Sequence, residues 1–270
     1  MWRPAVDGVS EVLHADFPAH SYPLHTHDTW TLLVVDRGAV RYRLGRHEHG
    51  ALPAMVTLLP PDVPHDGRPV TEAGFRKRVV YLEAGVIAAG TGSTGRPAWT
   101  DQALRERVDG LHAALRHPSE TFEAETRLAL LADELTGRLG RARPRSGPDP
   151  RLAARLRVLL DASTVDGLTL AHAADELGTG ATHLVRTFGH AYGIPPHRYL
   201  LGRRLDLARR LLLTGGRPAE VAAAAGFHDQ AHLTRQFKRF LGVTPGVFAA
   251  AVGEPGDPRT GKDGPEVARH

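Results

Sequence analysis

One short pattern occurs twice in the last third of the chain, at a constant offset. Residues 183–196 read HLVRTFGHAYGIPP, and residues 232–245 read HLTRQFKRFLGVTP. In each copy Leu, Arg and Phe follow a helical period, and a Gly stands where the helix would end. The duplication therefore predicts two similar helices, each preceded by a short helix and a turn. The paired positions are His183 and His232, Leu184 and Leu233, Arg186 and Arg235, Phe188 and Phe237, Gly193 and Gly242, and Pro196 and Pro245.

The bulk properties of the chain indicate a globular protein of about two domains. Its 270 residues exceed the usual domain size of about 100–200 residues, and a hydrophobic content of 41% is enough for a packed core. The absence of cysteine excludes disulfides, thiolate metal sites and a cysteine nucleophile. No apolar run reaches the length of a membrane helix, about 18 residues, and the N-terminus lacks the apolar stretch of a secretory signal. We therefore expect a cytoplasmic protein with no membrane partner.

Positive charge is concentrated in the part of the chain that contains the repeat. Residues 151–252 hold thirteen Arg or Lys against seven Asp or Glu, whereas residues 1–150 hold eighteen against nineteen. A local basic excess is typical of a module that faces phosphates, although a solvated basic surface produces the same count. The charge pattern thus agrees with nucleic-acid binding without establishing it.

The first part of the chain, residues 1–96, has the pattern of many short strands. Residues 29–35, 39–44, 54–60 and 77–83 are rich in β-branched or aromatic side chains, and Gly, Pro and Asp turns separate them. Closely spaced short strands predict a β-barrel or a β-sandwich.

Helical periodicity replaces the strand pattern after this point. Residues 97–141 predict two antiparallel helices with a break at 117–119, and they would connect the two domains. Residues 142–150 form a linker rich in Pro, Gly and Arg, and residues 151–252 are predicted to be all-helical. The tail, residues 253–270, is expected to be disordered because it contains mostly Gly, Pro and charged residues.

The helical region begins and ends its elements with recognisable capping residues. Thr169 and Asp229 can cap helices through their side-chain oxygens, and Gly178 can end one in the left-handed conformation. Pro218 suits the first turn of another helix. Helices are expected over residues 151–161, 168–178, 180–192, 196–214, 218–226, 230–242 and 245–252.

The helical region contains an ordered set of motifs: Leu184-x-Arg186-x-Phe188, Gly193-x-x-Pro196, Arg204-Leu205, Gly226-Phe227-x-Asp229, Leu233-x-Arg235-x-Phe237-Lys238 and Gly242-Val243-Thr244-Pro245. This set resembles the AraC/XylS family of transcriptional regulators. The resemblance implies two helix-turn-helix units joined by a long helix, with recognition helices in successive major-groove segments of promoter DNA. It also implies an α+β fold of two domains, in which a cupin-like β-barrel and a helical connector precede an all-α double helix-turn-helix. A homodimer is implied too, and RNA polymerase is a further candidate partner.

Residue type and helix position select the candidates for DNA contact. Arg can pair with guanine, Gln with adenine, and the methyl groups of Thr or Ala can contact thymine. For Arg186 and Arg235 a phosphate contact or a solvated side chain is the alternative. Lys238 and Arg239 are candidate phosphate contacts, which position a protein without reading sequence. The full set is Thr182, Val185, Arg186, Gln230, Ala231, Thr234, Arg235, Lys238 and Arg239.

The segments HTHDTWTLLVVDRG and PPDVPH resemble the two motifs of cupin barrels. Three neutral imidazoles, those of His25, His27 and His65, could bind Zn, Fe, Ni or Mn. However, Thr31 stands where the first motif has its carboxylate. We therefore interpret the histidines as lining an effector pocket, or making structural hydrogen bonds, and expect neither a metal nor another cofactor.

Two further residues are candidates for this pocket. Trp30 could form a pocket wall, with a plain core position as the alternative. Arg41 could meet an anionic effector, with an exposed face of the sheet as the alternative. The pocket candidates are thus His25, His27, Trp30, Arg41 and His65.

Motifs of common enzymes are missing from the chain. There is no Gly-x-Gly-x-x-Gly after a strand, no phosphate-binding loop and no His-Glu-x-x-His. We therefore expect a regulator, not an enzyme, whose binding to promoter DNA is modulated by a small-molecule effector. Two alternatives stay open: a metal-dependent cupin enzyme fused to a DNA-binding domain, and a ligand-independent regulator whose barrel serves only dimerisation.

Overall fold

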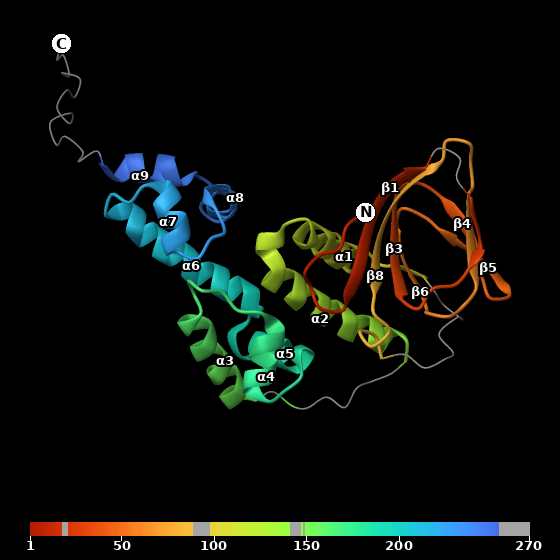
Figure 1. Ribbon diagram of the computed structural model, residues 1–270, viewed down its shortest axis with the longest axis horizontal. Coiled ribbons are helices and arrows are strands. Elements are labelled where there is room, and N and C mark those ends of the chain that lie inside the picture. Colours follow the sequence, from red (N-terminus) through yellow and green to blue (C-terminus); the bar gives the residue numbers. More distant parts are fainter. Residues whose placement is uncertain (18–20, 89–97, 141–146, 148, 254–270) are drawn as a thin grey trace, which may run out of the picture. The chain divides into compact units, whose positions relative to one another are not determined.

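The computed structural model describes residues 1–17, 21–88, 98–140, 147 and 149–253 (Figure 1). The linker expected at 142–150 and the tail expected at 253–270 lie almost entirely outside these residues. The strands are β1 (Val9–Phe17), β2 (Tyr22–His25), β3 (Trp30–Gly38), β4 (Val40–Leu44), β5 (His47–Ala51), β6 (Met55–Leu59), β7 (His65–Pro69), β8 (Phe75–Leu82) and β9 (Ala98–Thr100).

The described strands form two antiparallel sheets. Sheet 1 has the order β1-β8-β3-β6-β9, and sheet 2 has the order β2-β7-β4-β5. Alternate residues of β3 point to opposite faces of sheet 1. Leu33 and Val35 pack with Tyr42 of β4 between the two sheets, whereas Leu32 and Val34 join a different core. The barrel expected from the sequence therefore consists, in the described residues, of two sheets packed on each other.

Two helices cover the other face of sheet 1, as Figure 1 shows: α1 (Gln102–Leu115) and α2 (Thr121–Arg138). A short 3-10 turn, η2 (Pro118–Glu120), separates them. The Asp101 carboxylate accepts a hydrogen bond from the Leu104 N–H at 3.0 Å and so begins α1. The predicted helix pair is confirmed, and β9 extends sheet 1 beyond the expected boundary at residue 96 because it pairs with β6.

The first half of the C-terminal region folds into α3 (Pro150–Ala162), α4 (Leu170–Leu177) and α5 (Ala181–Tyr192), followed by the long α6 (Pro196–Leu213). The Thr169 hydroxyl accepts the His172 N–H at 3.2 Å. Gly178 ends α4 with a φ of 64°, a conformation that costs little only for glycine. Both caps predicted from the sequence are confirmed.

The second half consists of α6, α7 (Pro218–Ala224), α8 (Gln230–Leu241) and α9 (Pro245–Gly253). The Asp229 carboxylate caps α8 by accepting the His232 N–H at 2.6 Å. Phe237, Leu233 and Val221 pack in the core of this helical group. Every helix among the described residues is too short or too polar to cross a membrane.

The chain divides into two compact units inside α6. One comprises Met1–Ser163 and Leu168–Leu200, and the other comprises Thr164–Gly167 and the chain from Leu201 onward. The boundary expected at residues 142–150 therefore does not separate the units. The physical reason is that α2 packs on the first helical group, where Phe122 and Ala129 contact its core.

Candidate DNA-binding helices and effector pocket

Helix α8 presents most of the predicted DNA contacts on its surface. Gln230, Ala231, Arg235, Lys238 and Arg239 are exposed, and Thr234 is half-buried. The same helix buries Leu233 and Phe237 on its other side, four residues apart as one helical face requires. The structure thus leaves this face of α8 accessible to a large ligand such as a DNA duplex.

The equivalent face of α5 is covered, although its sequence pattern is the same. Val185 is only 1% exposed and packs in the core shared with α2, so its prediction as a base contact is wrong for this conformation. Arg186 keeps 29% of its side chain exposed, and its Nη1 lies 3.8 Å from the Asp133 carboxylate on α2. Thr182 is half-buried.

A groove of about 500 Å³ runs along this contact between α2 and α5. Comparison of the two repeats shows what α2 changes: Val185 corresponds to the half-buried Thr234, and Arg186 corresponds to the exposed Arg235. The covered residues of α5 are therefore those that its copy, α8, leaves accessible. The groove is lined by Leu130 of α2 and by Val185, Arg186, Gly189, His190, Gly193, Ile194 and Pro195.

The repeated histidine of α8 has a structural role. His232 is buried, and its ring packs edge-on against Phe227 with the centroids 5.3 Å apart. Burial, together with the charge of Arg235, lowers the pKa of His232 to about 4, so the ring is neutral near pH 7. The interpretation of this histidine as a packing residue is confirmed.

The three histidines of the predicted effector pocket lie together between the two sheets. His25 ends β2, His27 precedes β3, and His65 begins β7; each offers a ring nitrogen, and these nitrogens lie within 4.8 Å of one another. The pocket that they line has a volume of about 60 Å³. We call it the inner pocket, lined by Tyr22, His25, His27, Thr31, Leu33, Val40, Tyr42, Leu59, His65, Asp66, Gly67, Lys77, Val79 and Tyr81.

Trp30 and Arg41 lie outside the inner pocket. Trp30 is 4% exposed and packs in the core beneath α1 and α2, because it points away from its neighbour Thr31. Arg41 projects from the exposed face of β4, where its Nε lies 3.6 Å from the Glu48 carboxylate. Both pocket predictions are therefore wrong, and the alternatives, a core tryptophan and an exposed arginine, are correct.

Lys77 of β8 is a pocket residue that the sequence analysis missed. Its Nζ lies 4.0 Å from the centre of the Tyr22 ring, and burial lowers its pKa to about 8. Lys77 shares the inward face of β8 with Phe75 and Val79, and this direction follows from the way β8 pairs within sheet 1. A half-buried cation at such a position can bind an anionic group.

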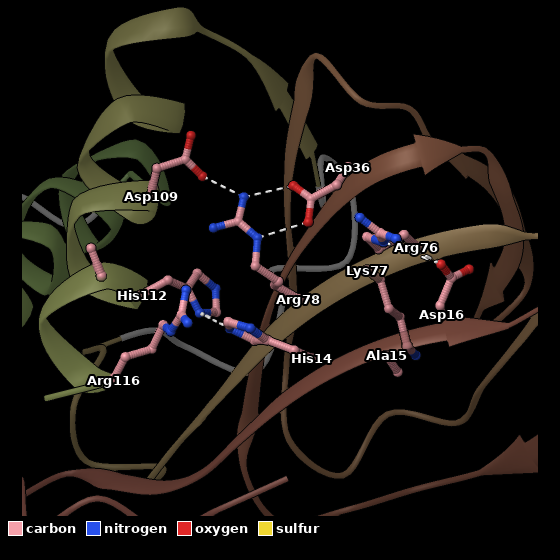
Figure 2. Close-up of a pocket in the computed structure, with 11 residues that line it drawn as sticks. His14, Ala15, Asp16, Asp36, Arg76, Lys77, Arg78, Asp109, His112 and Arg116 are labelled. Carbon is pink, nitrogen blue, oxygen red and sulfur yellow. Dashed lines mark hydrogen bonds and ion pairs between the residues drawn. The ribbon is translucent and has the colours of Figure 1, made fainter.

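A second groove, with a volume of about 510 Å³, lies between sheet 1 and α1 (Figure 2). In it the Arg78 guanidinium donates to the Asp36 carboxylate at 2.6 Å and to the Asp109 carboxylate at 2.7 Å. Close by, the rings of His14 and His112 approach to 3.2 Å between nitrogens. These contacts join β1, β3 and β8 to α1, and the sequence analysis did not anticipate them.

The buried His112 makes the stability of this unit depend on pH. Burial, followed by the positive charge of Arg78, lowers its pKa from 6.5 to about 3. Because the folded pKa lies below the unfolded value, the contribution to stability is complete above about pH 6.5 and is lost as the pH falls towards 3. At about pH 5 the cost of keeping the ring neutral is about 2 kcal/mol. The other charged or titratable groups around it are His14, Asp36 and Arg105.

We expect His112→Leu to reduce the acid sensitivity of the fold. Between about pH 7.5 and pH 5, the free energy of unfolding of the unmodified chain should fall by about 2 kcal/mol more than that of the variant. Urea unfolding at the two pH values measures this difference. His47→Gln, at an exposed position on β5, is the matched control and should behave like the unmodified chain. An equal loss of unfolding free energy in all three proteins would contradict the assignment of this acid sensitivity to His112.

The region of the inner pocket and the region of α5 and α8 are both similar to domains of known transcriptional regulators. A family model described as AraC-like ligand binding domain matches residues 7–132, and one described as helix-turn-helix domain matches residues 173–251. VirF, a virulence regulon transcriptional activator of Yersinia enterocolitica, is 35% identical over 92 residues, or 34% of each chain. This match thus spans about a third of the length of VirF.

Two further similarities extend over most of the chain. YbfI, an HTH-type transcriptional regulator of Bacillus subtilis, is 26% identical over 224 residues, which are 78% of this chain and 81% of that protein. The crystal structure of apo ToxT from Vibrio cholerae aligns with 93% of this chain and 100% of that chain, at 12% identity and a TM-score of 0.38.

Proposed function

Because the chain belongs to the AraC family of transcriptional regulators, we propose that it binds promoter DNA and that a small-molecule effector in the inner pocket modulates this binding. The observation that carries the proposal is the exposed face of α8, which combines Gln230, Arg235 and Lys238 above a buried core. Such a face can contact both base edges and phosphates. The protein would act on DNA in the cytoplasm, as a regulator and not as an enzyme, with RNA polymerase as a further partner.

Strand β8 connects the inner pocket to the helices. Lys77 points into the pocket, and its neighbour Arg78 points to the opposite face of sheet 1, where it bonds Asp109 of α1 at 2.7 Å. Helix α1 packs on α2 in the same core, and α2 in turn contacts α5. An effector that changes the position of β8 therefore has a continuous packed route to the first recognition helix.

The proposed regulation uses two states of the α2–α5 contact, one with α2 docked on α5 and one with α2 released from it. While α2 is docked, only α8 presents its reading face. When α2 withdraws, Arg186 and the surface around Val185 become accessible as well, and both recognition helices can bind one duplex. An effector controls the outcome only through its different affinities for the docked and released states. The homodimer implied by the family would have to use a surface other than the α2 face that packs on α5.

We expect weakening of this contact to raise the affinity for DNA. In the double variant Leu130→Gln/Asp133→Asn, α2 loses an apolar contact and the partner of Arg186. If the docked state dominates, the Kd for promoter DNA should fall several-fold. The reason is that the apparent affinity is limited by the fraction of molecules in the released state, which can bind DNA with both helices. Fluorescence anisotropy with a labelled duplex measures the change. The matched control is Glu106→Gln on an exposed position of α1, which alters net charge equally and should leave the Kd close to its original value.

Selection from random duplexes tests the proposed function itself. The full chain should enrich a defined sequence, and its affinity for that sequence should fall steeply with salt as phosphate contacts are screened. Binding with no preference over random competitor would refute the proposal. A thermal-shift screen of small anionic metabolites tests the effector separately. If no compound changes either the stability or the DNA affinity, the effector hypothesis is wrong. The alternative is then a ligand-independent regulator whose N-terminal domain serves only dimerisation.

A further inference from the structure

Although the sequence pattern predicts no metal here, the ring nitrogens of His25, His27 and His65 converge in the structure. We propose that these residues form a binding site for a divalent transition metal ion, with zinc the best match to the ligand set. The site would join β2, β7 and the segment before β3, and so would link sheet 2 to sheet 1. Only the consequence for regulation depends on the proposed function, because metal binding itself can be measured without DNA.

The hydrogen bonds of the three rings define which nitrogen is available. The Nδ1 atoms of His25, His27 and His65 lie 2.7, 3.0 and 2.9 Å from the backbone carbonyl oxygens of Pro23, Thr29 and Val63, respectively. A carbonyl oxygen can only accept, so in each neutral ring the proton is on Nδ1. The lone pair is then on Nε2. Rings whose second nitrogen donates to a backbone carbonyl are the arrangement found in metal-binding histidines.

The distances require only a small adjustment of the rings. The nitrogens now lie within 4.8 Å of one another, whereas nitrogens bonded to one zinc ion at about 2.0–2.1 Å are about 3.3 Å apart. Among the described residues, the Thr31 hydroxyl is the one side-chain group bonded to these Nε2 atoms, at 2.9 Å from that of His27. A hydroxyl rotates at little cost, so it can release this nitrogen to an ion.

The composition of the pocket selects the class of ion. Three imidazoles suit Zn²⁺, Ni²⁺, Co²⁺ or Cu²⁺, whereas Mg²⁺ and Ca²⁺ prefer oxygen ligands. The one carboxylate in the lining, Asp66, is occupied, because it accepts the Arg43 N–H at 2.7 Å and pairs with the Arg43 side chain. Three protein ligands leave a fourth position of a tetrahedral ion open.

Lys77 determines what can occupy the open position. Its ammonium group lines the same pocket, and its positive charge opposes a bare divalent cation at close range. An anionic fourth ligand, such as hydroxide or a small carboxylate, can contact both the ion and Lys77 and remove this repulsion. The volume of about 60 Å³ accommodates an ion with a ligand of only a few atoms. The structure thus points to a metal ion that is bound together with a small anion.

Metal titration of the untagged full chain tests the proposal. After chelator treatment and dialysis, calorimetry with ZnCl₂ should show one ion per chain, and Co²⁺ should produce the visible absorption of a tetrahedral nitrogen site. Zinc should also raise the thermal midpoint, because it binds only the folded arrangement, whereas Mg²⁺ should have no effect. His25→Ala and His27→Gln should each weaken zinc binding by more than roughly 10- to 100-fold, the loss that removal of an outer-shell partner already causes. His47→Ala, at an exposed position on β5, should bind zinc like the unmodified chain.

Substoichiometric zinc, or equal binding by the His25, His27 and His47 variants, would overturn the site and indicate adventitious binding to surface histidines. Circular dichroism of each variant verifies that a loss of binding is not a loss of folding. Thr31→Val retains all three ligands and should still bind zinc, so a complete loss there would also contradict the geometry. DNA binding measured in the same samples separates the hypotheses: a chain that binds zinc but no DNA refutes the proposed function and leaves the metal site intact.

Discussion

Replacing Arg235 by Ala is expected to weaken specific DNA binding by about 1–3 kcal/mol, or roughly 5- to 150-fold in Kd. Arg235 is exposed on α8, next to the half-buried Thr234 and one turn before Lys238. A guanidinium at this position can form two hydrogen bonds with a guanine edge, which no alanine can replace. Anisotropy titrations with the selected duplex, and with duplexes changed one base pair at a time, measure the loss. The variant should also discriminate less at one base position.

Lys238→Ala is the matched comparison on the same helix. A phosphate contact contributes equally to every sequence, so this variant should weaken all duplexes alike and reduce the slope of log K against log salt by about one unit. If Arg235→Ala leaves both affinity and base preference unchanged, α8 does not read DNA through this residue. If Lys238→Ala affects one sequence only, its assignment as a phosphate contact is wrong.

Replacing Phe237 by Ala is expected to lower the free energy of unfolding of the second unit by about 3–5 kcal/mol. Phe237 is 0% exposed and lies in the core formed by α6, α7 and α8, with its ring centroid 5.4 Å from that of Phe248. Truncation removes buried apolar surface and leaves a cavity that the surrounding helices fill only in part. Denaturant unfolding of the full chain, followed by far-UV circular dichroism, measures the effect.

Phe240 supplies a control of the same residue type on the same helix. Its side chain is 53% exposed, so Phe240→Ala should change stability by no more than about 0.5 kcal/mol. Equal costs for the two substitutions would mean that α8 does not pack through the Leu233–Phe237 face. The accessible face of α8, on which the DNA-binding proposal rests, would then be assigned wrongly.

Local features of the helical region were predictable because their causes are local. Thr169 and Asp229 bond backbone groups only three residues away, and Gly178 adopts a left-handed conformation whatever packs around it. The convergence of His25, His27 and His65 was also predictable, but only through the resemblance to a known motif. Lys77 was missed because its inward direction depends on the exact alternation of β8 within sheet 1.

The two repeats differ in a way that depends on tertiary packing. Arg186 and Arg235 occupy equivalent positions, yet Arg186 lies 3.8 Å from Asp133 of α2 and Arg235 is exposed. The different surroundings of the two arginines are produced by α2, a helix distant in the sequence, and not by the repeated pattern itself. The division of the chain into two units inside α6 depends in the same way on the packing of α2 against the first helical group.

The sequence by itself determined the duplicated helices, their caps, the strand-rich N-terminal part and the membership of a regulator family. These follow from periodicity, from hydrogen bonds between near neighbours and from ordered motifs. The tertiary structure alone decided that α2 covers the face of α5 that carries Val185 and Arg186, that Lys77 enters the inner pocket and that Trp30 does not. Such outcomes depend on which surfaces far apart in the chain exclude water together, and this is a property of the packed molecule rather than of any segment.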